Sequence, residues 1–181
     1  MTFSFIRNVL KEGREHKLEI YPLPYETNEL APVLSEDTIK YHYGKLAKTY
    51  AERYNNNEGD AGFNEAGVFL HNILFSQYQE PSGGNKPTGE ILDFIEKHYK
   101  TFDKFKEEFE KTAMSIQGSG WVYLAKDGKI KTIKNHEIKK DIVLLIDWWE
   151  HAWALDYQHD KKKYLENQWK IINWDKIKET K

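Results

Sequence analysis

The amino-acid sequence predicts an α+β fold, in which an N-terminal antiparallel helical hairpin is followed by a mixed domain with a three-stranded antiparallel sheet and surrounding helices. Apolar and aromatic residues recur at three- and four-residue steps over residues 39–50, as they do on one face of a helix, and a second, largely apolar segment follows at residues 63–78. A segment rich in Pro and Gly, residues 81–89, then interrupts this pattern. Beyond residue 118 the sequence changes to glycine-punctuated runs of β-branched and aromatic residues, which are typical of strands.

The interruption also predicts the domain organisation. A chain of 181 residues is long enough for one large domain or for one compact unit of two smaller ones. We expect an N-terminal extension over residues 1–20, a helical hairpin domain over residues 21–86, and a C-terminal α/β domain over residues 87–181.

The hairpin domain is predicted to contain two helices. Ser35 is a suitable N-cap, because acidic residues and then apolar residues at helical spacing follow it. We expect this first helix over residues 35–54, and the loop NNNEGDAG at residues 55–62 should end it. A second, largely apolar helix is expected from Phe63 to about Tyr78.

The C-terminal domain begins with two charged helices, at about residues 89–98 and 101–116. The Lys-Asp-Gly-Lys sequence at residues 126–129 predicts a β-hairpin, because Asp-Gly favours the tight turn between two antiparallel strands. The short apolar run DIVLLID, residues 141–147, is typical of a buried central strand. The remainder, residues 149–174, is expected to be helical.

The composition limits what the protein can bind. A formal net charge of −2 argues against a nucleic-acid-binding surface. The chain has no Cys, so any metal must be held by nitrogen and oxygen ligands rather than by thiolates. The start of the sequence has no uninterrupted apolar stretch long enough for a signal peptide or a membrane span. We therefore expect a cytoplasmic protein with no membrane partner.

Four residues suggest a metal site. Asp147 and His151 lie four residues apart in the run IDWWEHAWALDY, and His42 and His71 lie on the two predicted helices of the hairpin. Three His and one Asp describe a site for a first-row metal such as iron or manganese. Taken singly, each has an ordinary explanation: the two upstream histidines can be core or surface residues, and Asp147 can cap the following helix.

Several segments together resemble the iron/manganese superoxide dismutase family, and the resemblance extends over about residues 24–174. These segments are YHYGKLAKTY (41–50), PSGGNKPTG (81–89), GSGW (118–121), DWWEHAWALDY (147–157) and YLENQWKIINW (164–174). The resemblance implies dismutation of superoxide to dioxygen and hydrogen peroxide by a homodimer, and it makes residues 87–181 the metal-binding domain. It also implies one iron or manganese ion per subunit, with iron slightly favoured, bound by His42, His71, Asp147 and His151.

The same resemblance implies the surroundings of the metal. Tyr50 would be the gateway residue beside the substrate channel, and Trp121 and Trp149 would form its aromatic walls. Members of the family place a Gln or His that contacts the metal-bound solvent either on the second helix or on the strand hairpin. Gly67 occupies the helix position here, so we expect His136 on the hairpin to take this role and to tune the site.

Three further residues are expected to act around this centre. By the resemblance, Glu150 would reach His151 of the partner subunit, so that the dimer contact supports the metal ligands. Because the net charge is small, we expect local lysines to steer superoxide, and Lys45 and Lys161 are the candidates. A surface histidine remains the alternative for His136.

The position of the second ligand is ambiguous, because Asn72 competes with His71. Counting back from Pro81 favours Asn72, whereas counting forward from Phe63 favours His71. The amide of Asn is a poor ligand for such a metal. We therefore choose His71 and infer a one-residue insertion before Pro81.

The sequence departs from the family pattern at three places. The connection between the hairpin helices is short, Leu46 stands where a second His is expected, and Ala154 stands where an interface Tyr is expected. These departures keep a second hypothesis open, namely a superoxide-dismutase-like metal-binding protein with weak or no turnover. A two-His-one-carboxylate iron oxygenase is disfavoured by the third His.

Overall fold

The computed structural model describes residues 16–178, so the first fifteen residues of the predicted N-terminal extension lie outside the described part. The elements follow the predicted order of a helical hairpin, two helices, three strands and a helical C-terminal part. Within residues 16–178, every helix lacks the combination of length and apolar character that a membrane crossing requires.

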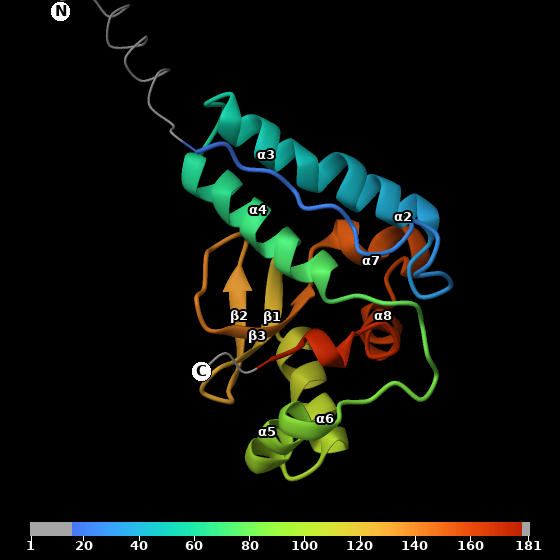
Figure 1. Cartoon of the computed structure of the whole chain (residues 1–181). Helices are drawn as coiled ribbons and strands as arrows, with labels where there is room; N and C mark the ends of the chain where they lie inside the picture. Colours follow the sequence, from blue (N-terminus) through green and yellow to red (C-terminus); the bar gives the residue numbers. More distant parts are fainter. Residues whose placement is uncertain (1–15, 179–181) are drawn as a thin grey trace, which may run out of the picture.

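The first helix of the hairpin is one continuous rod with three parts (Figure 1): α2, a π-helical turn η1, and α3, at Glu36–Tyr41, His42–Ala47 and Lys48–Asn55. Ser35 caps it as predicted, because its hydroxyl accepts a hydrogen bond from the Thr38 N–H at 3.1 Å. The π-helical part was not predicted. It begins at His42, and single π turns of this kind are frequent at functional sites.

The second helix of the hairpin, α4, spans Ala61–Ser76. Asp60 begins this helix by accepting an N–H of the first turn at 2.7 Å. An extended segment at residues 17–25, which we call the strap, lies between the two helices of the hairpin (Figure 1). The side-chain amides of Asn55 and Asn72 each make two hydrogen bonds to the strap backbone, at 2.8–3.0 Å. The strap is therefore part of the packing of the hairpin.

The C-terminal domain begins with α5 and α6, at Gly89–Tyr99 and Phe102–Met114. The sheet follows, and its strands are β1, β2 and β3, at Gly120–Ala125, Ile130–Lys134 and Ile142–Asp147. β1 is the central strand and pairs antiparallel with both neighbours. The predicted turn joins β1 to β2, and its glycine adopts a φ of 80°, which few other residues tolerate.

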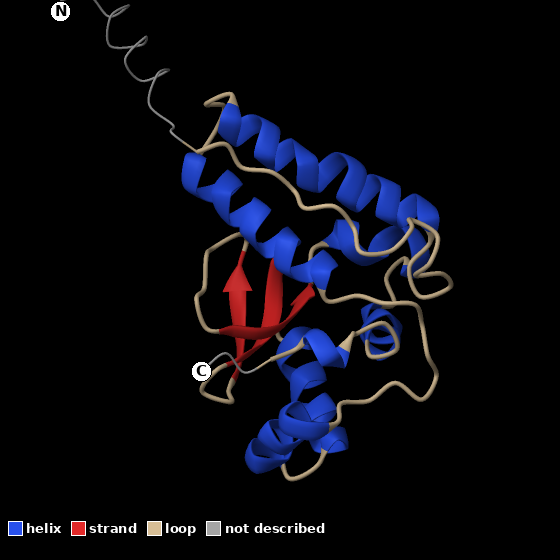
Figure 2. Ribbon diagram, in the orientation of Figure 1, coloured by secondary structure: helices blue, strands red, loops and turns tan. Residues whose placement is uncertain are grey.

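The prediction that residues 141–147 form a central strand is wrong, because β3 lies at an edge of the sheet. Residues 143–147 are nevertheless all buried. Figure 2 shows α4 lying across the sheet, between the sheet and the first helix of the hairpin. A continuous apolar run indicates that both faces of a strand are covered, but it does not indicate whether the strand is central or at an edge of the sheet.

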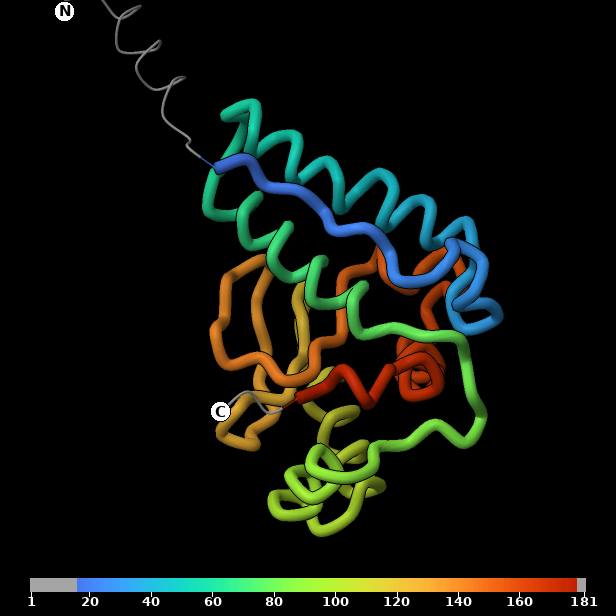
Figure 3. The backbone as a smooth tube through the Cα atoms, in the orientation of Figure 1, coloured from blue at the N-terminus to red at the C-terminus, as the bar shows by residue number. Residues whose placement is uncertain are grey.

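The prediction that residues 149–174 are helical is correct only in part. The chain forms α7 at Glu150–Tyr157, α8 at Lys161–Gln168 and a short 3-10 turn, η2, at Trp174–Lys176. Gln158 separates the first two helices with a φ of 53°. After α8 the chain returns beside the segment that follows α4 (Figure 3), where Tyr78 and Ile172 form a β-bridge.

One continuous core joins the hairpin to the C-terminal domain. The apolar side of α4 and the inner residues of the sheet are buried in it, as are Phe105 and Phe109 of α6. Burial of this apolar surface is the main force that fixes α4 against β3. The fully buried members include Leu70, Leu74, Phe105, Phe109, Trp121, Leu144 and Ile146.

Candidate metal centre

Four side chains from four separate elements converge in the interior. His42 begins η1, His71 lies in α4, Asp147 ends β3, and His151 lies in the first turn of α7. One nitrogen of each imidazole and one carboxylate oxygen lie within 4.8 Å of one another. The Oδ2 atom of Asp147 lies 3.1, 3.3 and 3.8 Å from the Nε2 atoms of His42, His151 and His71.

Hydrogen bonds to the backbone orient two of these side chains. The Nδ1 of His71 donates to the carbonyl of Gly67 at 2.7 Å, which leaves the Nε2 lone pair facing the cluster. The Oδ1 of Asp147 accepts the N–H of Trp149 at 2.8 Å, which leaves Oδ2 for the three imidazoles. Asp147 therefore both supports the start of α7 and belongs to the cluster.

The electrostatics of the cluster favour a bound cation. Burial lowers the pKa of His42 and His71, so both imidazoles are neutral. Burial alone would raise the pKa of Asp147, but the adjacent imidazole of His151 and the hydrogen bonds from His151 and His42 outweigh it and hold this pKa below its usual range. A buried carboxylate facing neutral imidazoles is costly without a positive partner. Three nitrogens and one oxygen are donors that iron and manganese accept, so these residues fit such an ion.

The structure places Asn72 outside the cluster. Its amide accepts from the Tyr21 N–H at 2.9 Å and donates to the Glu19 carbonyl at 3.0 Å, both in the strap. His71, one residue earlier on α4, is fully buried and points inward. The two residues thus lie on different faces of the same helix.

Tyr50 and His136 lie beside the cluster. The ring of Tyr50 lies 5.4 Å from that of His71 and 4.9 Å from that of His136. Its ring also lies on Gly67, where an added Cβ would approach the Tyr50 Cγ to 2.8 Å. Burial, together with the charge of Asp147, raises the pKa of Tyr50 to about 12, so its phenol stays protonated at neutral pH.

His136 is buried and has one ring nitrogen free for a further contact. Its Nδ1 accepts a hydrogen bond from the Trp121 indole at 3.2 Å, whereas its Nε2 has no partner among residues 16–178. Burial lowers the pKa of His136 to about 4, so the ring is neutral. The Trp121 indole also donates to the Asn135 carbonyl at 2.9 Å, and the Nε2 of His136 is left for a further hydrogen bond.

Aromatic rings enclose this group. Trp149 stacks on His136 at 4.5 Å and on His151 at 5.5 Å between ring centroids, and Trp121 meets His71 edge-on at 5.1 Å. The wall also contains Phe63, which lies 4.7 Å from His136, and this residue was not predicted. Its signal is its spacing on α4, because residues 63, 67, 71 and 75 recur every four residues on one face.

The remaining predicted residues lie in different surroundings. Glu150 and Lys45 are exposed. The ammonium group of Lys161 lies over the rings of Trp153 and Trp148, at 5.3 and 6.0 Å.

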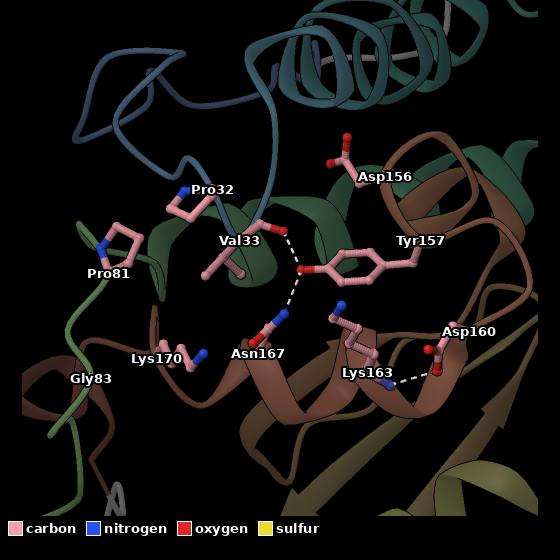
Figure 4. Close-up of a pocket in the computed structure, with 10 residues that line it drawn as sticks. All are labelled: Pro32, Val33, Pro81, Gly83, Asp156, Tyr157, Asp160, Lys163, Asn167 and Lys170. Carbon is pink, nitrogen blue, oxygen red and sulfur yellow. Dashed lines mark hydrogen bonds between the residues drawn. The ribbon is translucent and has the colours of Figure 1, made fainter.

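A surface cavity of about 660 Å³ lies away from the four clustered residues, between the segment before α2, the start of the 81–89 segment, and α7 and α8 (Figure 4). The Tyr157 hydroxyl lies in the wall of this cavity, where it donates a hydrogen bond to the Val33 carbonyl at 2.5 Å and accepts one from Asn167 at 3.1 Å. The cavity therefore lies where the segment before α2 meets α7 and α8, which these hydrogen bonds join. None of the four clustered residues lines it.

Comparisons with known proteins agree with this arrangement. Residues 16–69 match the α-hairpin domain of iron/manganese superoxide dismutases, and residues 87–180 match their C-terminal domain. The chain is 36% identical to a "Superoxide dismutase [Mn/Fe]" of Porphyromonas gingivalis, with 87% of this chain and 95% of that protein covered. It is 33% identical to a "Superoxide dismutase [Mn/Fe]" of Aeropyrum pernix, with 89% of each covered. It is also 33% identical to a "Superoxide dismutase [Fe]" of Bordetella pertussis, with 85% and 93% covered. The chain therefore belongs to the iron/manganese superoxide dismutase family.

Proposed function

We propose that the protein is a superoxide dismutase with one iron or manganese ion per chain, iron being slightly favoured. Two superoxide ions and two protons are converted to one dioxygen and one hydrogen peroxide. The observation that carries the proposal is the convergence of four donor atoms within 4.8 Å, one each from His42, His71, Asp147 and His151. A bound iron or manganese ion supplies a change between its 2+ and 3+ states, which lets one superoxide lose an electron and another gain one.

The residues of the chain hold this ion and its surroundings in place. Asp147 supplies the negative charge and the three imidazoles supply neutral donors, so the site keeps a net positive charge that attracts an anion. The hydrogen bond from His71 to Gly67 and the one from Trp149 to Asp147 fix two of the ligands before the ion binds.

We expect Tyr50 and His136 to donate hydrogen bonds to an anion at the site and to relay protons to the peroxide product. The phenol of Tyr50 is protonated at neutral pH, and its pKa of about 12 keeps it so. The Nε2 of His136 is buried and has no partner among the described residues, so it is free to make a hydrogen bond to an anion at the site. Both rings lie within 6 Å of the His71 ring, between centroids.

The aromatic wall excludes water and competing ligands. Trp121 is fully buried, and Trp149 covers both His136 and His151 with its ring. Phe63 and Phe75 complete the wall, since Phe75 lies 5.0 Å from the His42 ring between centroids. An enclosure of this kind strengthens the electrostatic interactions inside it.

Four finer features belong to the same proposal. Lys45 and Lys161 steer superoxide, because the net charge of the chain is only −2 and local cations must supply the attraction. The protein acts as a homodimer in the cytoplasm, and Glu150, which is exposed in the single chain, contacts His151 of the partner subunit. Residues 21–86 and 87–181 are its hairpin and metal-binding domains, after an extension at residues 1–20.

A superoxide-scavenging assay driven by riboflavin and light tests the proposal on protein loaded separately with iron and with manganese. We expect activity well above that of the free ion for at least one metal. Replacing His42 by Ala should abolish it, whereas replacing the exposed His159 by Ala should not. Full metal occupancy without activity above the free ion would favour the metal-binding relative with weak or no turnover.

A further inference from the structure

We propose that Gln77 is a positioning residue for the metal centre, because it ties the strand that carries Asp147 to the helix that carries His71. The inference rests on the proposed function only in that the four clustered residues bind a metal. Gln77 follows directly on α4, and it is 4% exposed. It touches none of the four clustered side chains through the hydrogen bonds described for it.

The edge position of β3 creates a need for such a residue. A strand at a sheet edge leaves alternate N–H and C=O groups without partners from the sheet. These groups are buried in β3, because Leu145, Ile146 and Asp147 are fully inaccessible to solvent. A buried backbone group without a partner is strongly unfavourable, so another part of the chain must supply the missing hydrogen bonds.

The side chain of Gln77 supplies both bonds at Leu145. Its Nε2 donates to the Leu145 carbonyl at 2.8 Å, and its Oε1 accepts the Leu145 N–H at 2.8 Å. The amide thus replaces one residue of a neighbouring strand. Its own backbone carbonyl accepts the N–H of Asn173 at 2.7 Å, so the side chain projects from a fixed point.

A second contact fixes the same edge two residues later. The Tyr164 hydroxyl donates to the carbonyl of Asp147 at 2.9 Å. Tyr78, the residue after Gln77, is also buried, and its hydroxyl donates to Gln168 at 2.6 Å. Gln77, at the end of α4, therefore binds the backbone of Leu145, and α8 binds the backbone of Asp147 through Tyr164. In both residues of β3 these backbone groups point away from the sheet.

This arrangement couples two of the metal ligands. His71 lies on α4 six residues before Gln77, and Asp147 lies two residues after Leu145. Their facing atoms, Nε2 and Oδ2, are 3.8 Å apart. Because neither α4 nor β3 bends easily, the amide of Gln77 sets the offset between helix and strand and hence this separation. Without the Gln77 amide, the N–H and carbonyl of Leu145 would form hydrogen bonds with other groups, and the end of β3 that carries Asp147 would shift.

The test compares Gln77→Met with Asn85→Leu in the full-length protein. Met keeps the length of the Gln side chain and removes both hydrogen bonds. Asn85 is the matched control, because its amide also makes two backbone hydrogen bonds, to Trp169 at 2.9 Å and Ile172 at 2.7 Å, away from β3. The readouts are the rate of metal release to a chelator, the electron paramagnetic resonance spectrum of the Mn(II) form, and hydrogen exchange of the Leu145 amide.

For Gln77→Met we expect metal release to become about 10- to 100-fold faster, the range typical of residues that support metal ligands. The Mn(II) spectrum should change, and the Leu145 amide should exchange faster. Asn85→Leu should leave the rate of metal release and the exchange rate of the Leu145 amide within about twofold of the wild type, and it should leave the Mn(II) spectrum unchanged. This should hold even if its melting temperature falls as much as that of Gln77→Met. Equal changes in both variants, or none in Gln77→Met, would overturn the inference.

If Gln77→Met does not fold, Gln77→Glu and Asn85→Asp replace the pair. Glu keeps an acceptor for the Leu145 N–H and loses the donor to its carbonyl, so metal release should still accelerate relative to Asn85→Asp. Equal release rates would overturn the inference here as well. These readouts do not use turnover, so a chain that binds metal without dismutase activity would refute the proposed function and leave this test valid.

Discussion

Replacing Gly67 by Ala tests whether the ring of Tyr50 is held in place by α4. An added Cβ at this position would lie 2.8 Å from the Tyr50 Cγ and 3.0–3.1 Å from its Cδ atoms. Carbon atoms prefer roughly 3.5–4.0 Å, so the ring must move by about 0.7 Å or more. Tyr50 has little room to do so, because Phe63 and His136 lie 5.9 and 4.9 Å from it between ring centroids.

Two opposing terms set the change in stability. Ala is better than Gly inside a helix by about 1 kcal/mol. Overpacking a tight interior costs about 1–3 kcal/mol. The Gly67→Ala protein should therefore be less stable by about 0–2 kcal/mol, because the second term exceeds the first. This corresponds to a fall in melting temperature of at most about 8 °C for a chain of this size.

Gly62→Ala provides the matched control on the same helix. Its added Cβ would meet only Asp60 Oδ1, at an ordinary 3.5 Å, so this variant should gain up to about 1 kcal/mol. The proposed role of Tyr50 depends on the position of its ring, and a displacement of about 1 Å at a reacting group can cost about 100-fold, so kcat/KM of Gly67→Ala should fall by about 10- to 100-fold with full metal content. Calorimetry, metal analysis and pulse-radiolysis kinetics measure these quantities. A Gly67→Ala protein as stable and as active as Gly62→Ala would refute the reasoning.

Two further predictions concern the ligand register and the pH dependence of stability. His71→Ala should abolish metal binding, whereas Asn72→Ala should retain it. Asn72→Ala should lower the free energy of unfolding by about 1–2 kcal/mol, because it removes two hydrogen bonds to the strap. Metal analysis and calorimetry measure these effects, and the reverse pattern would contradict the choice of His71. Lys131 bridges Asp127 and Asp141. The backbone N–H of Lys129 and then Lys131 hold the pKa of the Asp127 carboxylate below its usual value, and Lys131 does the same for the Asp141 carboxylate. The stability they contribute is present above the unfolded value of 3.8 and is lost as pH falls through their lower folded values, so the difference in melting temperature between the wild type and Lys131→Met should shrink on acidification from about pH 5 to about pH 2. A difference that stays constant over this range would contradict the assignment.

The sequence by itself determined the order of the elements and the residues that converge. Ser35, the loop at residues 55–62 and the turn at 126–129 act through local backbone preferences, which are readable from a few neighbouring residues. The spacing of Asp147 and His151 places both at one strand-to-helix junction, and the family resemblance identified the two distant histidines.

Only the tertiary structure decided which partners these elements find. It placed His71 rather than Asn72 in the interior, because the packing of α4 fixes the rotation of the helix. In the tertiary structure β3 lies at the sheet edge, which the sequence did not predict. The backbone hydrogen bonds that β3 lacks from a neighbouring strand are made by Gln77 and Tyr164, which lie 68 and 17 residues from the groups they contact. Contacts between distant segments depend on how faces meet in space, and no local pattern encodes that meeting.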